Sequence, residues 1–313
     1  MTPSILFLVF NRPASTAKVF SAIRAAKPRR LYIGADGPRA NNPNDTRDCR
    51  EVRKILSSVD WPCEVRTWFR SDNVGCRAAV REAITWFFEN EEEGIILEDD
   101  CVPHPAFFRY TQCLLQRFRE DQRIMSVTGT NVFGSIDNIP STYLLSIYSL
   151  CWGWATWARA WRLYDDRLIR LDEFLSDGSF AHYALSLPVA RRWEERFRQV
   201  RDFGLDSWAT VWTFACWANN GLTCTPRTNL VSNIGFGPSG THTWDKSSRF
   251  SSLPTHELAF PLKHPAIIAP DSFYDGYVSS QFYGIDPADQ TSVEEALARN
   301  LQLMRDHVRN DGS

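Results

Sequence analysis

Three consecutive carboxylates, Glu98, Asp99 and Asp100, directly follow the apolar run Ile95 to Leu97. Carboxylates crowded at the edge of a core repel one another and lose hydration unless a cation or hydrogen-bond donors meet them. Oxygen ligands suit Mg²⁺ or Mn²⁺, and Mg²⁺ usually takes one or two carboxylates together with substrate phosphate oxygens. Neighbouring side chains of an extended segment alternate, so we expect Glu98 and Asp100 on one side and Asp99 on the other. A solvated acidic turn is the alternative.

The acidic triplet ends the last of four apolar segments that have strand patterns and are separated by helix-compatible sequence. Their starts fall about every 30 residues, the length of a strand, a crossover helix and two loops. This spacing predicts an α/β fold: a mainly parallel sheet of Rossmann-like βα units with helices on both faces. Ligands bind such sheets at the carboxyl ends of the strands. The four predicted strands are Ile5–Phe10, Leu31–Ala35, Glu64–Phe69 and Gly94–Leu97.

Helical patterns connect and follow these strands. The helix from Pro13 is expected to bury Ala17, Phe20 and Ile23, and the helix Cys76–Phe88 to bury a stripe from Val80 to Phe88. After Gly129 the character changes, because eight of the twelve tryptophans lie between Trp152 and Trp217. The other predicted elements are helices 105–119, 189–203, 206–219 and 293–308 and strands 124–128 and 142–148, with a loop-like chain from Gly235.

Composition narrows the functional classes. The 313 residues are 43% hydrophobic, enough for a sizeable core, and the net charge of −2 provides no whole-chain field for nucleic acid. The apolar run Ile5–Phe10 is too short to span a membrane, for which about 18 residues are needed. Eight cysteines without a CxxC pair favour reduced thiols. We expect a cytoplasmic protein without a transmembrane segment, and peripheral association with the inner face of the membrane stays open.

Several short motifs carry a resemblance to a known family. The sequence contains neither GxxxxGK[ST] nor GxGxxG after the first strand, which disfavours P-loop and dinucleotide sites. The motifs FNRP, ADGPR, DNVGC and EDD, each after one predicted strand, resemble the GT-A glycosyltransferases, which use nucleotide-sugar donors. EDD is similar to their DxD metal motif, and the chain looks like a bacterial glycosyltransferase family 2-like group. WGWATW, LDSW and NIGFGPSGTH extend the match to residue 242.

The resemblance implies a nucleotide-sugar-binding half, residues 1–130, and a Trp-rich acceptor-side half, residues 131–313, of one GT-A domain. In this scheme Asp100 binds the metal that bridges the donor diphosphate. Turn formation by Asp36 and Asn73, and surface ion pairs of Arg12 and Arg77, are the alternatives. The donor-site residues implied are Phe10, Asn11, Arg12 and Asp36 at the base, Asn73 and Arg77 along the nucleotide pocket, and Glu98 and Asp99 at the ribose or sugar.

The resemblance also implies residues in the second half. His242, in a glycine-containing loop, is a further metal ligand, and imidazole suits Mn²⁺ better than Mg²⁺. Asp206 is the base that takes the proton from the acceptor hydroxyl, unless it only caps a helix; Asp202 and Asp245 are the substitutes. The cluster Trp152, Trp154, Trp157 and Trp161 includes positions at helical spacing, so core packing is its default interpretation, and Trp154 and Trp208 are the tryptophans assigned to the acceptor.

Together these observations predict a metal-dependent, inverting glycosyltransferase, a hexosyl- or N-acetylhexosaminyltransferase of bacterial polysaccharide biosynthesis. Its donor is a nucleoside diphosphate sugar, UDP by family habit, and its acceptor is a glycan or a lipid-linked glycan. One rival is a sugar-phosphate nucleotidylyltransferase, a class with a Gly-rich, basic loop after the first strand that NRPAST does not match. The other rival is a non-catalytic glycan-binding module, which would need neither the metal triplet nor His242.

Overall fold

The structure is a computed structural model, and it describes residues 2–137, 139–176, 178, 180, 183, 186–237 and 247–286. The expected metal ligand His242, the substitute base Asp245 and the expected helix 293–308 lie outside the described residues. No helix in these ranges combines the length and the apolar character that crossing a bilayer requires. All eight cysteines are free thiols.

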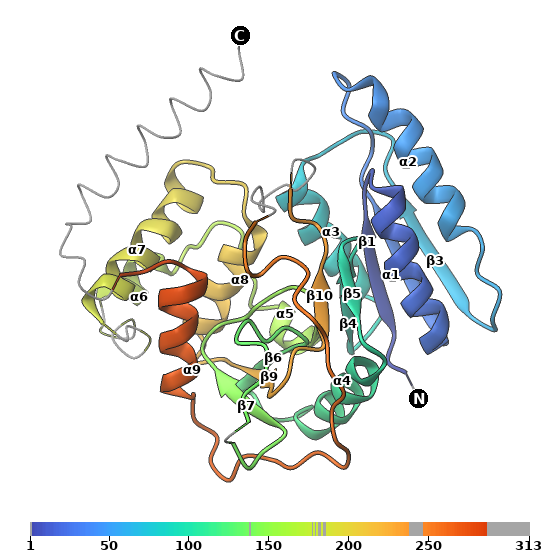
Figure 1. Ribbon diagram of the computed structural model, residues 1–313. Coiled ribbons are helices and arrows are strands. Elements are labelled where there is room, and N and C mark those ends of the chain that lie inside the picture. The colour runs from blue at the N-terminus through green and yellow to red at the C-terminus, as the bar shows by residue number, and fades with distance from the viewer. Residues whose placement is uncertain are drawn as a thin grey trace.

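An eight-stranded sheet runs through the molecule in the order β3-β2-β1-β4-β8-β6-β9-β7 (Figure 1). The four strands β3, β2, β1 and β4 are parallel neighbours, whereas β8 is antiparallel to both β4 and β6, and β7 is antiparallel to β9. The predicted mainly parallel α/β fold is thus confirmed. The strands of this sheet are β1 Ile5–Val9, β2 Arg30–Ala35, β3 Glu64–Phe69, β4 Glu93–Glu98, β6 Ile124–Thr128, β7 Tyr143–Ser146, β8 Trp154–Trp157 and β9 Leu222–Pro226.

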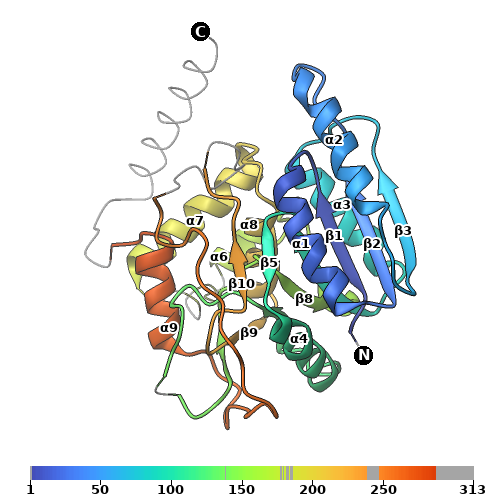
Figure 2. The same cartoon turned by 45° about the vertical axis from the view of Figure 1, so that its right-hand side comes forward.

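Helices cover both faces of this sheet. Helix α1 packs against α2 and α4 on one face, and α3 packs against α5 and α8 on the other (Figures 1 and 2). A small antiparallel ladder of β5 (Cys101–Pro103) and β10 (Val231–Asn233) lies beyond β4. The helices are α1 Pro13–Ala26, α2 Pro43–Leu56, α3 Cys76–Phe88, α4 Pro105–Arg117, α5 Ala158–Trp161, α6 Leu171–Ser176, α7 Leu187–Asp202, α8 Trp208–Trp217 and α9 Ser272–Tyr277, the last continued by a π-helical turn, η2, Val278–Phe282.

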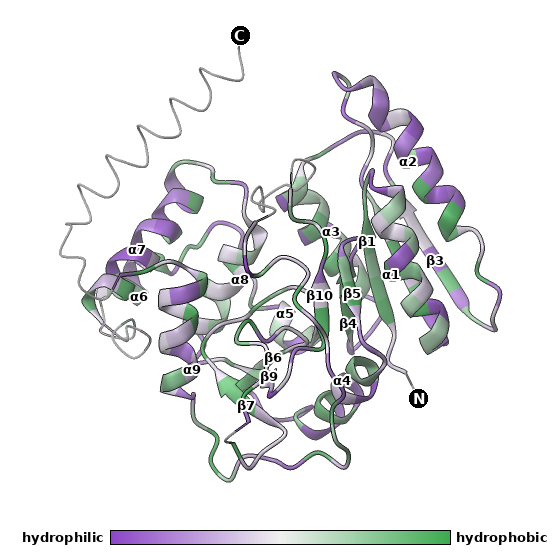
Figure 3. Cartoon of the chain, viewed as in Figure 1, coloured by the Kyte–Doolittle hydropathy of each residue, from purple (hydrophilic) through white to green (hydrophobic). Residues whose placement is uncertain are grey.

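Burial follows the hydropathy pattern that the sequence shows. Every residue of β1 is buried, because helices lie on both sides of it, and Figure 3 shows β1 and β4 as hydrophobic against the largely hydrophilic α2 and α7. Helix α1 begins at Pro13, as expected, but it buries Thr16 in place of Ala17. The hydroxyl of Thr16 donates to the carbonyl of Arg12 at 2.7 Å, so the buried polar group is satisfied.

Three segments differ from the sequence-based expectation. The tryptophans of WGWATW are not on one helix: Trp154–Trp157 form β8, which is inserted between β4 and β6, and α5 starts only at Ala158. Strand β3 is mostly exposed, because it is the edge of the sheet and is paired only with β2. In the region expected to be loop, α9 and η2 form a short helical segment.

Helix α9 is tied to the sheet by a buried carboxylate. The Asp275 side chain accepts a hydrogen bond from Ser146 Oγ at 2.5 Å and one from the Ile147 backbone N–H at 3.3 Å. Burial raises the pKa of Asp275 from 3.8 to about 7, against the effect of these two donors. The protonated carboxyl is therefore favoured in the folded state.

Replacing Asp275 with Asn is expected to remove a pH-dependent part of the folding free energy. A folded-state pKa above the unfolded value contributes stability that is complete below about pH 3.8 and is lost as pH rises through about 7. The free energy of unfolding of the wild type minus that of D275N should therefore decrease as the pH is raised from about 3.8 to about 7. Urea unfolding at a series of pH values measures it, and a difference that is constant or rises with pH contradicts the assignment.

Candidate active site

A cavity of about 260 Å³ opens at the carboxyl ends of β1, β2 and β4. The sheet register makes this meeting point, because Val9 pairs with Ala35 and Leu8 pairs with Glu98, so the residues after all three strands emerge at one edge. The cavity brings together seven of the residues expected from the sequence. They are Phe10, Arg12, Asp36, Asn73, Glu98, Asp99 and Asp206.

The acidic turn is bridged by the guanidinium of Arg12. Arg12 Nη1 lies 2.6 Å from Asp100 Oδ2, and Nη2 lies 3.3 Å from Asp99 Oδ1. The expectation that Glu98 and Asp100 share one side is corrected here: Asp99 and Asp100 face the same cation. The reason is that β4 ends at Glu98 and the two aspartates lie in a turn, where strand alternation no longer holds.

The charges of this turn are not balanced by Arg12. Burial, and then repulsion from Asp100 and Asp99, raises the pKa of Glu98 to about 8. Burial raises the pKa of Asp99 to about 7, although Arg12 opposes this shift. Burial disfavours the charged guanidinium, yet Asp99 and Asp100 raise the pKa of Arg12 above its usual value. One guanidinium does not compensate three ionised carboxylates, so Glu98 and Asp99 bind protons more readily than isolated carboxyl groups do, and a bound cation would meet the same need.

The residues at the turn fit a divalent cation that shares its coordination with a phosphate. Within the described residues no group of three His, Cys, Asp or Glu side chains is arranged to hold a metal ion, so a complete protein cage is not present there. Mg²⁺-type sites need only one or two carboxylates when substrate phosphates supply the rest. Asp99, which lines the cavity, and the adjacent Asp100 provide two carboxylates of the kind such a site would use.

The chain closes tightly over Asp100. The backbone N–H of Ile234 donates to the Asp100 carbonyl at 2.9 Å, which extends the ladder of β10 with β5. Gly235 then packs on the carboxylate: a Cβ at this position would lie 2.0 Å from Asp100 Oδ2. The sequence NIGFGPSGTH thus reaches the acidic turn through Gly235, while the proposed ligand His242 is outside the described residues.

Asp36 clamps two turns together on the β2 side of the cavity. Its carboxylate accepts hydrogen bonds from the Gly37 N–H at 2.8 Å, from the Val74 N–H at 3.2 Å and from Asn73 Nδ2 at 2.8 Å. Burial raises the pKa of Asp36, although the backbone donors oppose this shift. A Cβ on Gly37 would lie 2.4 Å from the backbone of Asp72, so only glycine permits this contact. Asp36 and Asn73 therefore stabilise turns, and both also line the cavity.

Two residues expected at the donor point elsewhere. Asn11 Nδ2 donates to Asp45 Oδ1 at 2.8 Å, toward α2. The Arg77 guanidinium binds Asp166, with Nε 2.9 Å from Oδ1, and does not line the cavity. Its expected place in the nucleotide pocket is corrected for this reason. In its stead Arg39, which stands within ADGPR, lines the cavity with its guanidinium carbon 5.4 Å from the centre of the Phe10 ring.

Asp206 reaches the cavity from the acceptor-side half. It does not cap its own helix, since Ser207 is the N-cap of α8. Instead Asp206 Oδ1 accepts the backbone N–H of Arg77 at 2.9 Å and so caps α3, where Gly75 at the N-cap offers no side chain. The carboxylate thus joins α3 and the start of α8 and lines the same cavity as Glu98 and Asp99. Sequence reasoning could not identify this partner, which is 129 residues away.

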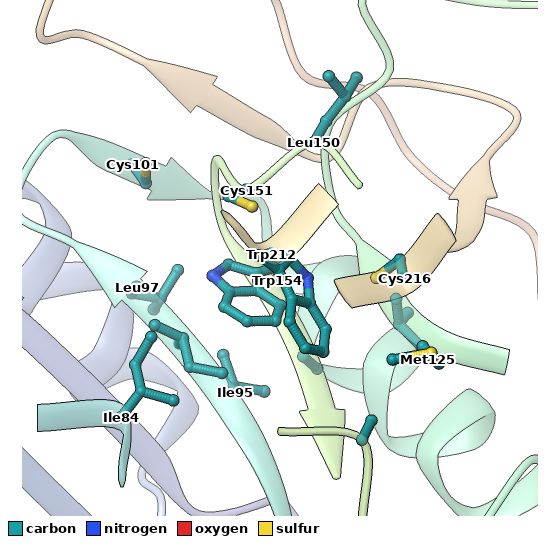
Figure 4. Close-up of a cluster of buried hydrophobic side chains, with 14 of the residues drawn as sticks. Ile84, Ile95, Leu97, Cys101, Met125, Leu150, Cys151, Trp154, Trp212 and Cys216 are labelled. Atoms are coloured by element: carbon teal, nitrogen blue, oxygen red, sulfur yellow. The ribbon is translucent and has the colours of Figure 1, made fainter. Parts of the chain in front are cut away.

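The two tryptophans expected at the acceptor belong to the core. Trp154 is 0% exposed and Trp208 is 5% exposed, and their rings stack with centroids 5.8 Å apart. Figure 4 shows Trp154 and Trp212 side by side between Ile95 and Leu97 of β4 and Met125. Core packing, the default interpretation of the tryptophan cluster, is the arrangement found, and the acceptor role of Trp154 and Trp208 is corrected because neither ring offers a free face.

Comparison with known proteins finds similar folds only. No family model and no curated protein matches the chain. A UDP-glucose pyrophosphorylase complexed with UDP-glucose is similar at 9% identity and a TM-score of 0.30, covering 52% of this chain and 79% of that one. An apo UDP-glucose pyrophosphorylase is similar at 7% identity and a TM-score of 0.37, covering 74% of this chain and 93% of that one. HddC from Yersinia pseudotuberculosis complexed with GMP-PN is similar at 7% identity and a TM-score of 0.32, covering 50% of this chain and 78% of that one. Likeness at this level concerns parts of an α/β fold and says nothing further about the site.

Replacing Gly235 with Ala is expected to disturb the acidic turn. The added methyl group meets Asp100 Oδ2 and forces the carboxylate or the chain to move, and overpacking of this kind costs about 1 to 3 kcal/mol. Urea unfolding measures the loss. Gly276→Ala is the matched control, because a Cβ there meets nothing within 4 Å. Equal stability of G235A and G276A contradicts the close packing over Asp100.

Proposed function

We propose that the chain is a metal-dependent glycosyltransferase that moves a sugar from a nucleoside diphosphate donor to a hydroxyl group of a glycan. The observation that carries the proposal is one cavity lined both by the negatively charged acidic turn, through Glu98 and Asp99, and by Asp206. The acidic turn comes from the end of β4, and Asp206 comes from the start of α8. Groups suited to donor and to acceptor chemistry therefore meet at one cavity.

The donor side is supported by charge. A divalent cation bound at Asp99 and Asp100, with His242 as a further ligand, would neutralise the charge that gathers on the leaving diphosphate. Arg12 and Arg39 add two guanidinium groups to the same cavity, and guanidinium groups pair with phosphate oxygens in bidentate fashion. Phe10 beside Arg39 offers an aromatic face to the nucleotide base. UDP is the carrier that we test first.

The acceptor side is supported by Asp206. As base, its carboxylate takes the proton of the attacking hydroxyl while the bond between the sugar and the diphosphate breaks on the opposite side of the anomeric carbon. This single displacement inverts the configuration. The hydrogen bond from Arg77 N holds Asp206 Oδ1 at 2.9 Å, so the carboxylate has a fixed position at the cavity.

A sugar-phosphate nucleotidylyltransferase is the second candidate. The similar structures include enzymes of this kind, two UDP-glucose pyrophosphorylases, and Arg12 places a cation after β1. The turn itself differs from the Gly-rich loop expected of that class: Phe10 to Arg12 are the only residues between β1 and α1, and none of them is glycine. A product assay separates the two reactions.

The product assay offers each reaction its own substrates with Mn²⁺. UDP-, GDP- and CMP-sugars without acceptor should give slow hydrolysis to nucleotide and free sugar, measured by chromatography. Nucleoside triphosphate with sugar 1-phosphate should give no pyrophosphate. Replacing Asp100 with Ala should abolish the hydrolysis, because the turn loses a carboxylate that is proposed to bind the metal. Pyrophosphate release by the wild type, or full hydrolysis by D100A, contradicts the proposal.

Two substitutions at Asp206 separate catalysis from helix capping. Asn keeps an oxygen that accepts the Arg77 N–H but cannot take a proton, so D206N should fold and bind UDP as the wild type does and lose transfer by about 100-fold or more. Ala loses both functions, so D206A should also be less stable: urea unfolding should give a free energy of unfolding about 1 kcal/mol below that of the wild type. Transfer rates with UDP affinity measured in parallel test this. Normal turnover by D206N would show that another residue acts as the base.

A further inference from the structure

The guanidinium of Arg12 lies where a cation on the acidic turn would have to bind. Its Nη1 is 2.6 Å from Asp100 Oδ2 and its Nη2 is 3.3 Å from Asp99 Oδ1, and the Arg12 side chain is 20% exposed. A divalent ion needs a carboxylate oxygen at about 2.1 to 2.5 Å. The guanidinium places a positive charge against that oxygen of Asp100, so it repels a divalent ion there and weakens the binding of the ion. Gly235 packs against the same oxygen, so Asp100 cannot turn Oδ2 away on that side.

We propose that Arg12 and the divalent cation compete for Asp100, and that the nucleotide diphosphate decides the competition by giving Arg12 a new partner. Without nucleotide, Arg12 is the counter-ion of the turn. With nucleotide, the guanidinium moves to a phosphate oxygen and leaves Asp100 to the metal. The proposal rests on the proposed function, since it assigns the way in which metal and donor enter that site together.

The energetics of buried ion pairs favour this coupling. A cation that displaces Arg12 in the absence of nucleotide leaves a guanidinium unpaired in a poorly hydrated cavity, and an uncompensated buried charge is strongly unfavourable. A diphosphate removes that cost, because its oxygens form charge-assisted, bidentate bonds with the guanidinium. Binding free energies are reciprocal, so the nucleotide raises the affinity for the metal by the same factor as the metal raises the affinity for the nucleotide.

The structure lets the side chain move while its backbone stays in place. The carbonyl of Arg12 accepts hydrogen bonds from the Thr16 N–H at 3.0 Å and from Thr16 Oγ1 at 2.7 Å, which fixes residue 12 at the start of α1. The guanidinium lines the cavity together with Glu98 and Asp99. A change of side-chain rotamer is therefore enough to carry it from the turn toward a ligand in the cavity.

The test measures Mn²⁺ binding in the absence of nucleotide, from the signal of free Mn²⁺ in electron paramagnetic resonance. Arg12→Gln removes the competing charge and keeps a polar side chain, so R12Q should bind Mn²⁺ at least about tenfold more tightly than the wild type. The wild type should reach tight binding only after UDP is added, and UDP should raise the Mn²⁺ affinity of R12Q by a smaller factor.

Three further variants keep the test specific. Arg70→Gln removes a guanidinium that lines the same cavity but pairs with Glu82, and its Mn²⁺ affinity should stay close to that of the wild type. Adding Asp100→Asn to R12Q should cancel the gain. Arg12→Lys keeps the charge but not the bidentate geometry of the guanidinium, so it should give a smaller gain in Mn²⁺ affinity. R12K replaces R12Q in the test if circular dichroism shows that R12Q does not fold.

Two results overturn the competition. One is Mn²⁺ affinity of R12Q and R12K without UDP that equals or falls below that of the wild type. The other is tight Mn²⁺ binding by the wild type without UDP. Failure of the proposed function gives a different result, namely wild-type protein that binds no UDP in the presence of Mn²⁺ while R12Q still gains affinity for Mn²⁺ alone.

Discussion

The site depends on one electrostatic constraint: two buried carboxylates, Asp99 and Asp100, stand next to the half-buried Glu98 and must be met by positive charge. The sheet creates the constraint, because β4 carries Glu98 to the edge of the core and the following turn presents Asp99 and Asp100. Arg12 meets part of it from the turn after β1. The remaining negative charge explains why a phosphate ligand would be accepted here only together with a cation.

The rest of the fold holds that turn in position. The parallel pairing of β1 with β2 and β4 aligns the ends of the three strands, and β10 closes over Asp100 through Ile234 and Gly235. Helix α3 begins beside the cavity, and its first turn is capped by Asp206 from the other half of the chain. The same hydrogen bond that stabilises α3 therefore fixes the group proposed as base. The structural role of Asp206 and its proposed role as base thus share one geometry.

Much of the nucleotide half could be predicted from the sequence, because local signals determine it. Apolar runs before FNRP, ADGPR and EDD gave strands, and Pro13 marked the start of α1. The contacts that could not be predicted join residues far apart: Arg12 with Asp100 across 88 residues, and Asp206 with Arg77 across 129. The strand formed by Trp154–Trp157 could not be predicted for a related reason. Trp154 stands at helical spacing to its neighbours, yet its strand is inserted between β4 and β6, which only the complete sheet reveals.

A crystal structure of the protein with Mn²⁺ and UDP tests the central claim most directly. The account predicts anomalous density for one Mn²⁺ bonded to an Asp100 oxygen and to the diphosphate at about 2.1 Å, with the Arg12 guanidinium moved onto a phosphate oxygen. Nucleotide bound elsewhere, or bound in the cavity with no metal and with Arg12 still bridging Asp99 and Asp100, contradicts it.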